Sequence, residues 1–184
     1  DMPGVVDAVA YIAGLRQASE GRIEVCGRAP QDAVRAGLAS VIFQQPVLLE
    51  WLTTEENVLL PLSIAGRKPD QEWYDTVIST VGLRDRLDHR PSELSGGQQQ
   101  RVAVARALAS RPSIVFADEP TGNLDSRAGI EVMTMLQELH AQGITVVLVT
   151  HSDEVARHAE RIIHIRDGRV VGDEAVTARL FARD

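Results

Sequence analysis

Short apolar runs that end on polar residues constrain the fold of this chain more than any other feature. Residues 113–117 and 144–150 have strand length and no polar alternation. Such runs are typical of parallel strands that are covered on both faces. Residues 38–43 form a third run, and a helical pattern at 126–141 separates the other two. We therefore predict an α/β fold with a parallel sheet.

Residues 46–110 interrupt this alternation with helical patterns. Thr53 and Glu56 are spaced as a capping box that opens a helix towards residue 64. Further helices are expected over 72–81 and 98–109. We predict a helical subdomain at 46–110 that is inserted between a partial α/β core at 1–45 and the rest of that core at 111–184.

Three smaller elements are expected around this framework. A helix over 1–15 should end at Gly14, and the alternation of residues 22–26 between Gly21 and Gly27 predicts a strand. Asp167 and Gly168 predict a hairpin turn between strands at 161–166 and 169–171.

The composition narrows the class of partner. The chain has 184 residues and a formal net charge of −7, which argues against a general nucleic-acid binder. No apolar run approaches the length of a membrane span, and no signal-peptide pattern is visible. One cysteine, Cys26, excludes an internal disulfide. We expect a cytosolic protein.

The segment 94–101 predicts a helix N-terminus that can receive an anion. Ser95 and Gln98 are spaced as a capping box, and Gly96 and Gly97 leave their backbone amides accessible. Such amides and the helix dipole favour phosphate. The alternative is an ordinary helix cap.

Polar residues follow three of the predicted strands. Gln44 follows the first, Asp118 and Glu119 the second, and His151 the third. Ligands of open α/β sheets bind beyond the carboxyl ends of the strands. One carboxylate could serve Mg²⁺ while the next orients a water for attack on phosphorus. Taken singly, each could also be a turn residue, a helix cap or a structural histidine.

In this order and spacing the motifs resemble the ATP-binding cassette (ABC) ATPases over nearly the whole chain. Residues 94–101 resemble the signature motif, 114–119 the Walker B strand and 122–125 the D-loop. Gln44 resembles the Q-loop glutamine and His151 the switch histidine. The phrase at 118–125 resembles the branch of macrolide-exporter and lipoprotein-release ATPases. The resemblance implies a P-loop NTPase-like parallel sheet core with an inserted helical lobe.

The resemblance also implies ATP and Mg²⁺ as ligands, with a role for each matching residue. Glu119 and His151 would be catalytic, and Gln44 and Asp118 would attend the metal. The residues implied in binding nucleotide are Gln44, Ser95, Gly96, Gly97, Gln98, Asp118 and Asp125. The implied partners are a second ATPase domain, in a homo- or heterodimer, and a transmembrane permease, but no nucleic acid. The chain would then be cytoplasmic and peripheral on the inner face of the membrane. Trp51, after Gln44, would face the permease or pack within the helical lobe.

The N-terminus departs from the family pattern at the P-loop. Gly4 matches the second P-loop glycine, but Val5 stands where the lysine is expected and Val6 where the hydroxyl residue is expected. The only lysine is Lys68. We expect the N-terminal strands to be missing, and the Walker B-like strand to lose a neighbour and present an open edge. Loss of two or three charged phosphate contacts would weaken ATP binding by about 10³-fold.

Three functional hypotheses follow. The first is an ATP-binding and ATP-hydrolysing subunit of an ABC transporter, with a truncated or degenerate P-loop. The second is a catalytically impaired chain that donates its signature motif to another cassette in an asymmetric dimer. The third, a non-transport ABC protein of DNA repair or translation, is disfavoured by the acidic charge and the single cassette. Whether the chain is itself an enzyme stays open, since we expect it to be inactive alone.

Overall fold

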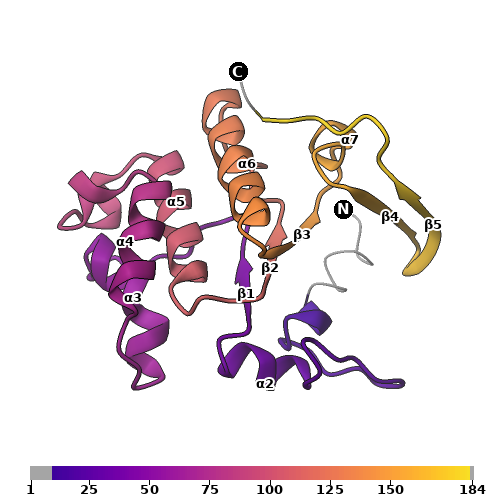
Figure 1. The fold of residues 1–184 in the computed structure, drawn as a ribbon, viewed down its shortest axis with the longest axis horizontal. Coiled ribbons are helices and arrows are strands. Elements are labelled where there is room, and N and C mark those ends of the chain that lie inside the picture. Colours follow the sequence, from indigo (N-terminus) through magenta and orange to yellow (C-terminus); the bar gives the residue numbers. More distant parts are fainter. Residues whose placement is uncertain (1–9, 183–184) are drawn as a thin grey trace.

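The computed structural model describes residues 10–182 (Figure 1). Residues 10–12 are helical, and Gly14, with φ 74°, ends this turn as predicted. The rest of the expected N-terminal helix and the P-loop positions Gly4, Val5 and Val6 lie outside the described residues. The elements in chain order are α2 (Pro30–Arg35), β1 (Ala39–Ile42), α3 (Thr54–Ile64), α4 (Gln71–Thr80), two 3₁₀ turns (Arg84–Arg86 and Pro91–Glu93), α5 (Gly96–Leu108), β2 (Ile114–Asp118), α6 (Ser126–Ala141), β3 (Thr145–Val149), α7 (Asp153–Ala156), β4 (Arg161–Arg166) and β5 (Arg169–Ala175).

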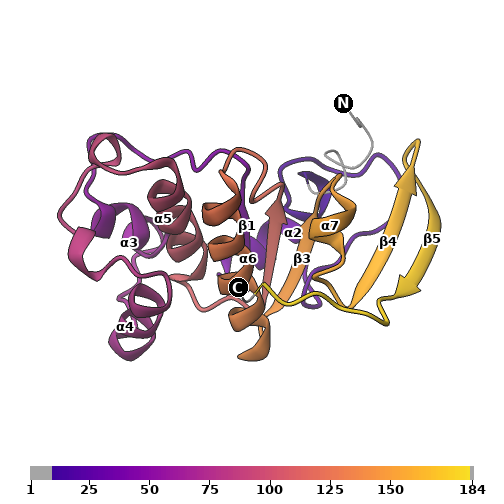
Figure 2. The ribbon, with the colours of Figure 1, turned by 90° about the horizontal axis from the view of Figure 1, so that it is seen from above.

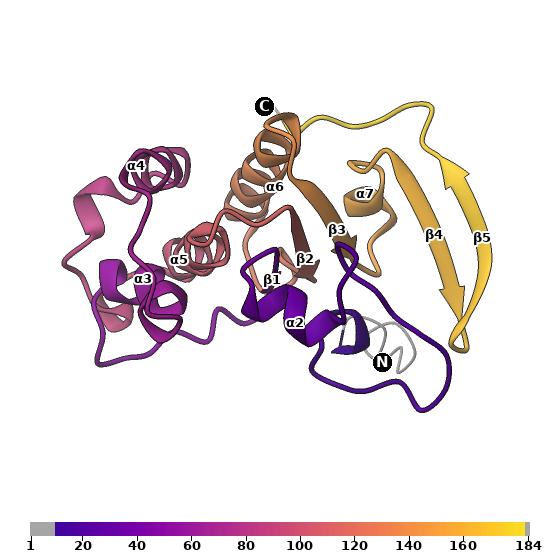
Figure 3. The same ribbon diagram turned by 60° about the horizontal axis from the view of Figure 1, so that its bottom comes forward.

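A parallel sheet forms the centre of the fold, which confirms the predicted α/β class. The strand order is β1-β2-β3, and both pairs are parallel. The middle residues of β2, Val115, Phe116 and Ala117, are at most 2% exposed. Figure 3 shows α2 on one side of β1 and β2 and α6 on the other. Layers on both faces explain why these strands are apolar without alternation.

The open edge was predicted on the wrong strand. β2, the Walker B-like strand, pairs with β1 on one side and with β3 on the other. Within residues 10–182, the outer strands of this sheet are β1 and β3, and β3 is the outer strand on the side of β4 (Figure 2). Its residues 146–149 are only partly buried. The apolar run at 38–43 supplies the neighbour that β2 was expected to lack.

Strands β4 and β5 form a separate antiparallel hairpin, at the right of Figure 2. Asp167 and Gly168 have φ of 50° and 72°, the left-handed values that a tight two-residue turn requires. This confirms the predicted turn. β5 extends beyond the expected residue 171 to Ala175, and Arg161 pairs with Asp173 across the hairpin at 2.6 Å.

The predicted strand at 22–26 is wrong. This segment makes a single bridge between Val25 and Arg28, around a turn in which Cys26 and Gly27 have φ of 52° and 70°. An extended segment needs a neighbour to become a strand, and its backbone lies beside none in the described chain. Val25 is buried nonetheless, packed with Ala33 and Phe116.

Helices α3, α4 and α5 gather beside the sheet (Figure 1). The capping boxes of Thr53 with Glu56 and of Ser95 with Gln98 are both formed, as predicted. The apolar faces of the three helices join those of α6 and β2 in one buried cluster. In the part of the chain described, no helix is long and apolar enough to cross a bilayer.

Candidate functional site

The ends of β2 and β3 bring Glu119 and His151 into direct contact. Glu119 Oε1 lies 2.7 Å from His151 Nδ1 and accepts a 2.7 Å hydrogen bond from the His151 backbone N–H. Glu119 Oε2 accepts a hydrogen bond from the Thr150 hydroxyl at 3.1 Å. The carboxylate side chain is 17% exposed and the imidazole 73%. The chain therefore fixes a carboxylate–imidazole pair where β2 and β3 end, and the imidazole is open to a ligand.

The backbone of Glu119 turns sharply at the end of the strand. Its φ is 43°, in the left-handed region that a residue with a β-carbon rarely adopts. The Glu119 N–H still bonds Val149 O at 2.8 Å, and its carbonyl accepts from Gly122 at 3.0 Å. Such strain of about 1–3 kcal/mol persists only where surrounding contacts enforce it, which is common at functional sites.

Asp118 carries a buried oxygen that the described chain leaves unpaired. Its Oδ1 has no hydrogen-bond partner within residues 10–182. Burial raises the pKa of Asp118, and the negative charge of Glu119 raises it further. An unpaired buried carboxylate oxygen is costly and is the kind of hard ligand that Mg²⁺ binds. The residues present therefore fit a divalent cation.

Gln44, at the end of β1, turns towards the loop that follows β2. Its side-chain amide contacts Asn123 Oδ1 at 3.4 Å. A β-carbon at Gly122 would lie 2.8 Å from Gln44 Nε2, so the absence of a side chain at Gly122 permits this approach. The structure thus joins the predicted Q-loop and D-loop residues.

The N-terminus of α5 is capped but still open to a ligand. Ser95 Oγ accepts from the Gln98 N–H at 3.3 Å, and Gln98 Oε1 accepts from the Ser95 N–H at 2.8 Å. A β-carbon at Gly96 would meet no other part of the described chain within 4 Å. The amides of Gly96 and Gly97 have no acceptor within their own helix, because they belong to its first turn.

A polar pocket of ≈ 370 Å³ separates this helix end from the start of α6. Its lining includes Ser95, Gly96, Gly97, Gln98, Asn123 and Asp125. Asp125 caps α6 by accepting from the Ala128 N–H at 2.9 Å. Arg101 does not offer free charge to this pocket, because it pairs with Glu131 of α6. Arg127 also lines the pocket; its side chain is 91% exposed and lies 3.5 Å from the same Glu131. Backbone amides and Arg127 are therefore the groups that can receive an anion there.

The structure groups the predicted site residues into two neighbouring sets. Asp118, Glu119 and His151 lie at the carboxyl ends of β2 and β3. Residues 95–98 line the polar pocket. Asn123 lies between these sets, since it contacts Gln44 and also lines the pocket. Sequence reasoning missed Thr150 as a partner of Glu119. Its place directly before His151, at the end of a strand adjacent to β2, was the available signal.

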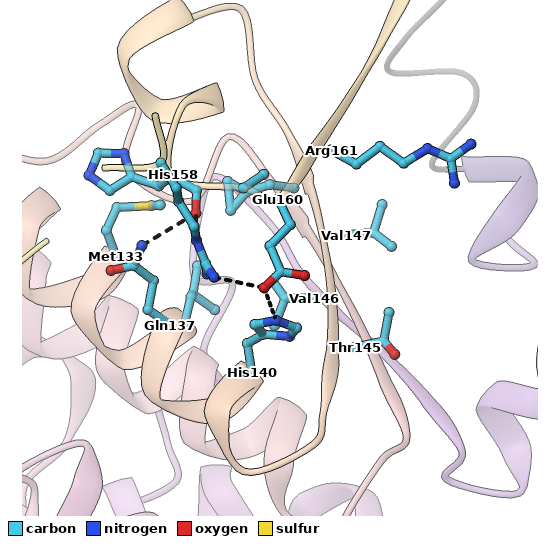
Figure 4. Close-up of a pocket in the computed structure, with 13 residues that line it drawn as sticks. Met133, Gln137, His140, Thr145, Val146, Val147, His158, Glu160 and Arg161 are labelled. Atoms are coloured by element: carbon cyan, nitrogen blue, oxygen red, sulfur yellow. Dashed lines mark hydrogen bonds and ion pairs between the residues drawn. The ribbon is translucent and has the colours of Figure 1, made fainter. Parts of the chain in front are cut away.

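A second cavity, of ≈ 330 Å³, lies along the free edge of β3 (Figure 4). Its wall includes Met133 and Val146, and Glu160 accepts from Arg179 at 2.9 Å and lies 3.2 Å from His140 Nε2. None of the predicted site residues lines this cavity.

Comparisons with known proteins agree with this geometry. The family model described as "ABC transporter" matches residues 8–122. The chain is 46% identical over 177 residues to the macrolide export ATP-binding/permease protein MacB of Chlorobium luteolum, covering 91% of this chain and 26% of that protein. It is 50% identical over 139 residues to the uncharacterized ABC transporter ATP-binding protein MJ1508 of Methanocaldococcus jannaschii, covering 74% of this chain and 62% of that protein.

A solved structure supports the same relationship. The dimeric structure of a post-hydrolysis state of the ATP-binding cassette MJ0796, bound to ADP and Pi, is 37% identical and superposes with a TM-score of 0.79, covering 93% of this chain and 80% of that chain. Measured against the two relatives named above, the chain spans about a quarter of the length of the macrolide export protein and less than two thirds of the length of MJ1508.

Proposed function

Because the chain belongs to the ABC transporter ATP-binding family, we propose that it is the nucleotide-binding part of a transporter similar to the macrolide exporters, and that it couples ATP hydrolysis to a membrane permease. The observation that carries this proposal is the strand-end cluster, in which Glu119 and His151 are in contact at 2.7 Å next to the unpaired oxygen of Asp118. In this reading the chain is cytoplasmic and reaches the membrane through the permease.

Asp118 and Gln44 are the residues proposed to hold Mg²⁺. Asp118 offers its unpaired Oδ1, and Gln44 keeps its carbonyl oxygen available because its amide nitrogen faces Asn123. A bound Mg²⁺ would neutralise charge on the phosphate oxygens. Since its burial disfavours an unpaired charge, the carboxylate of Asp118 gains most from a cation.

Glu119 is proposed to orient the attacking water and to receive its proton. The water oxygen would bond to the γ-phosphorus as the bond from that phosphorus to the ADP oxygen breaks. Oε1 already accepts two hydrogen bonds from His151, whereas Oε2 accepts one from Thr150. Oε2 therefore retains a lone pair for the water. His151 holds the carboxylate and presents its exposed ring to the phosphate.

The N-terminus of α5 is proposed to contact nucleotide bound by a second cassette. Its glycine amides face a polar pocket rather than the strand-end cluster, and the solved cassette with 37% identity is dimeric. We assign residues 46–110 to a helical subdomain and 1–45 with 111–184 to the core. Val47 and Trp51, which are 65% and 69% exposed, are proposed to face the permease.

The Glu119→Gln variant tests the catalytic role in a chain whose P-loop sequence has been restored, because Val5 stands at the lysine position and the chain is expected to be inactive alone. Phosphate release from Mg²⁺-ATP should fall at least about a hundredfold, because the proton acceptor is lost. Glu154→Gln, an exposed carboxylate in the first turn of α7, is the matched control and should leave the rate unchanged. Equal, measurable rates for the P-loop-restored chain with and without Glu119→Gln would contradict the role.

The second candidate function is donation of the signature helix to another cassette. It is favoured by the open first turn of α5 together with Val5 at the P-loop lysine position. The chain is mixed with an intact cassette whose own signature serine has been replaced by arginine, so that any activity must use this chain's α5. Under this reading Ser95→Arg abolishes phosphate release in the mixture while Glu119→Gln leaves it unchanged. A mixture with Ser95→Arg that keeps its phosphate release would contradict this reading.

A further inference from the structure

Two polar side chains of α5 hold the backbone on either side of Gln44. Gln100, which is 1% exposed, donates to Phe43 O at 3.2 Å. Arg106 donates to Val47 O at 2.8 Å and to Pro46 O at 3.0 Å. The backbone that carries Gln44 is therefore attached to α5 both before and after that residue.

The Arg106 contact is specific in its geometry. Its two terminal nitrogens each take one of two consecutive carbonyls, which the planar guanidinium fork permits and a single ammonium does not. Burial lowers the pKa of Arg106, and its bonded partners are carbonyls rather than a carboxylate. Val47 sits at φ 31°, a backbone conformation that needs external support in a β-branched residue.

We propose that Gln100 and Arg106 are positioning residues that make the loop 43–47 and helix α5 move as one unit. A ligand at the first turn of α5 would then be coupled to Gln44 at the strand-end cluster. This inference rests on the proposed function, because it assigns a mechanical link between the two sites that the function requires.

The contacts run from side chains of α5 to backbone atoms of the loop. The loop conformation is therefore fixed without the use of the loop's own side chains, and Val47 and Trp51 stay exposed. At the other end of the loop, Asn57 of α3 accepts from Leu49 N at 2.9 Å and donates to Leu49 O at 3.1 Å. The segment from Phe43 to Leu49 is thus tied to α5 at one end and to α3 at the other.

Amide hydrogen exchange of the whole chain tests the link. The variants are Arg106→Met, Arg106→Lys and Gln100→Met, and the control is Arg84→Met, which removes an exposed arginine that bonds Ser79. In Arg106→Met we expect the peptide 43–52 to exchange about tenfold faster while α6 is unchanged. Arg106→Lys should restore part of the protection and Gln100→Met should lose part of it. Unchanged exchange of 43–52 in Arg106→Met, or an equal acceleration in α6, would overturn the proposal.

A second arm measures coupling to the ligand site. The chain is mixed with ATP and the intact cassette whose signature serine is arginine. In the parent chain and in Arg106→Lys, protection should increase both in the first turn of α5 and in 43–52; in Arg106→Met it should increase in α5 alone. Equal protection of 43–52 in Arg106→Met would overturn the link. If α5 gains no protection even in the parent chain, the proposed partner contact is wrong, and the first arm still decides the role of Arg106.

Discussion

Asp118 and Glu119 are consecutive carboxylates with opposite surroundings. Glu119 accepts three hydrogen bonds, two from His151 and one from Thr150. Asp118 keeps a buried oxygen without a partner within residues 10–182. Protein donors satisfy the first carboxylate, whereas the second has the unpaired oxygen that the proposed cation would bind. A site of this kind sacrifices stability in the unliganded chain.

The Asp118→Asn variant should therefore be more stable than the parent chain at pH 7. The folded pKa of Asp118 is raised above its ordinary value of 3.8, so the contribution of Asp118 to stability is present below that value and is lost as the pH rises through the folded pKa. Removing the charge should raise the melting temperature by about 2–4 °C at pH 7 and have little effect near pH 3. Thermal unfolding at both pH values checks this.

The matched control is Asp88→Asn, which neutralises an exposed carboxylate and should change the free energy of unfolding by less than about 0.5 kcal/mol. A parent chain that melts at the same temperature as Asp118→Asn, or above it, at pH 7 would contradict the argument.

Gly122→Ala should disturb the cation site without unfolding the chain. The new β-carbon would lie 2.8 Å from Gln44 Nε2, and the end of that flexible side chain can move away. We expect the contact with Asn123 to be lost and the affinity for a divalent cation to fall about tenfold. Titration with Mn²⁺, followed by paramagnetic broadening of the resonances of β1 and β2, measures the affinity. Gly129→Ala, where the nearest atom is at 3.7 Å, is the control; equal affinities in the two variants would count against the role of Gln44.

At the scale of single residues, position along the chain predicted the candidates better than it predicted their contacts. The carboxyl ends of neighbouring parallel strands lie side by side, so Glu119 and His151 could be placed together from the sequence. The pairing of Arg101 with Glu131 could not, because it depends on the approach of α5 to α6. The Thr150 hydroxyl bond depends likewise on the register of β2 with β3.

At the scale of elements, Asn57 joins α3 to the segment before it. It is fully buried, accepts from Leu49 N and donates to the carbonyls of Leu49, Leu52 and Thr53. In Asn57→Ala the carbonyls of Leu49 and Thr53 keep their backbone donors, but Leu49 N and Leu52 O lose the bonds that Asn57 gives them. The change should therefore cost about 3 kcal/mol and lower the melting temperature by about 6–12 °C. Thermal unfolding measures the loss. Asn123→Ala, whose side chain is exposed, should cost far less, and equal losses for the two variants would refute the assignment.

Helices were more predictable than strand neighbours. The caps at Thr53 and Ser95 are local signals in the sequence, and the helices they begin form as expected. A strand depends on its partner, which local sequence does not name. Residues 22–26 alternate correctly but pair only in the bridge of Val25 with Arg28 within the described chain, and β2, which was expected to lose a neighbour, pairs on both sides.

At the scale of the whole molecule, α5 connects two sets of functional groups. Its first turn faces the polar pocket beside α6, and its later turns hold the backbone around Gln44 through Gln100 and Arg106. The strand-end cluster of Asp118, Glu119 and His151 lies at the carboxyl ends of β2 and β3, and the loop 43–47 follows the neighbouring strand β1. This arrangement suits a chain that works against a second cassette, because a phosphate contact at α5 can be transmitted to the chain's own Gln44.

The most direct test of this account is ATP-dependent association with an intact cassette whose signature serine is arginine, measured as mass by sedimentation. We predict that the two chains form a heterodimer only with Mg²⁺-ATP, and that Ser95→Arg in this chain prevents it, since a bulky cation then fills the space above Gly96. Gln142→Arg, at the C-terminal end of α6, should leave the heterodimer intact. A mixture that stays monomeric with Mg²⁺-ATP, or a heterodimer that Ser95→Arg does not affect, would contradict the central claim that the first turn of α5 binds nucleotide held by a second cassette.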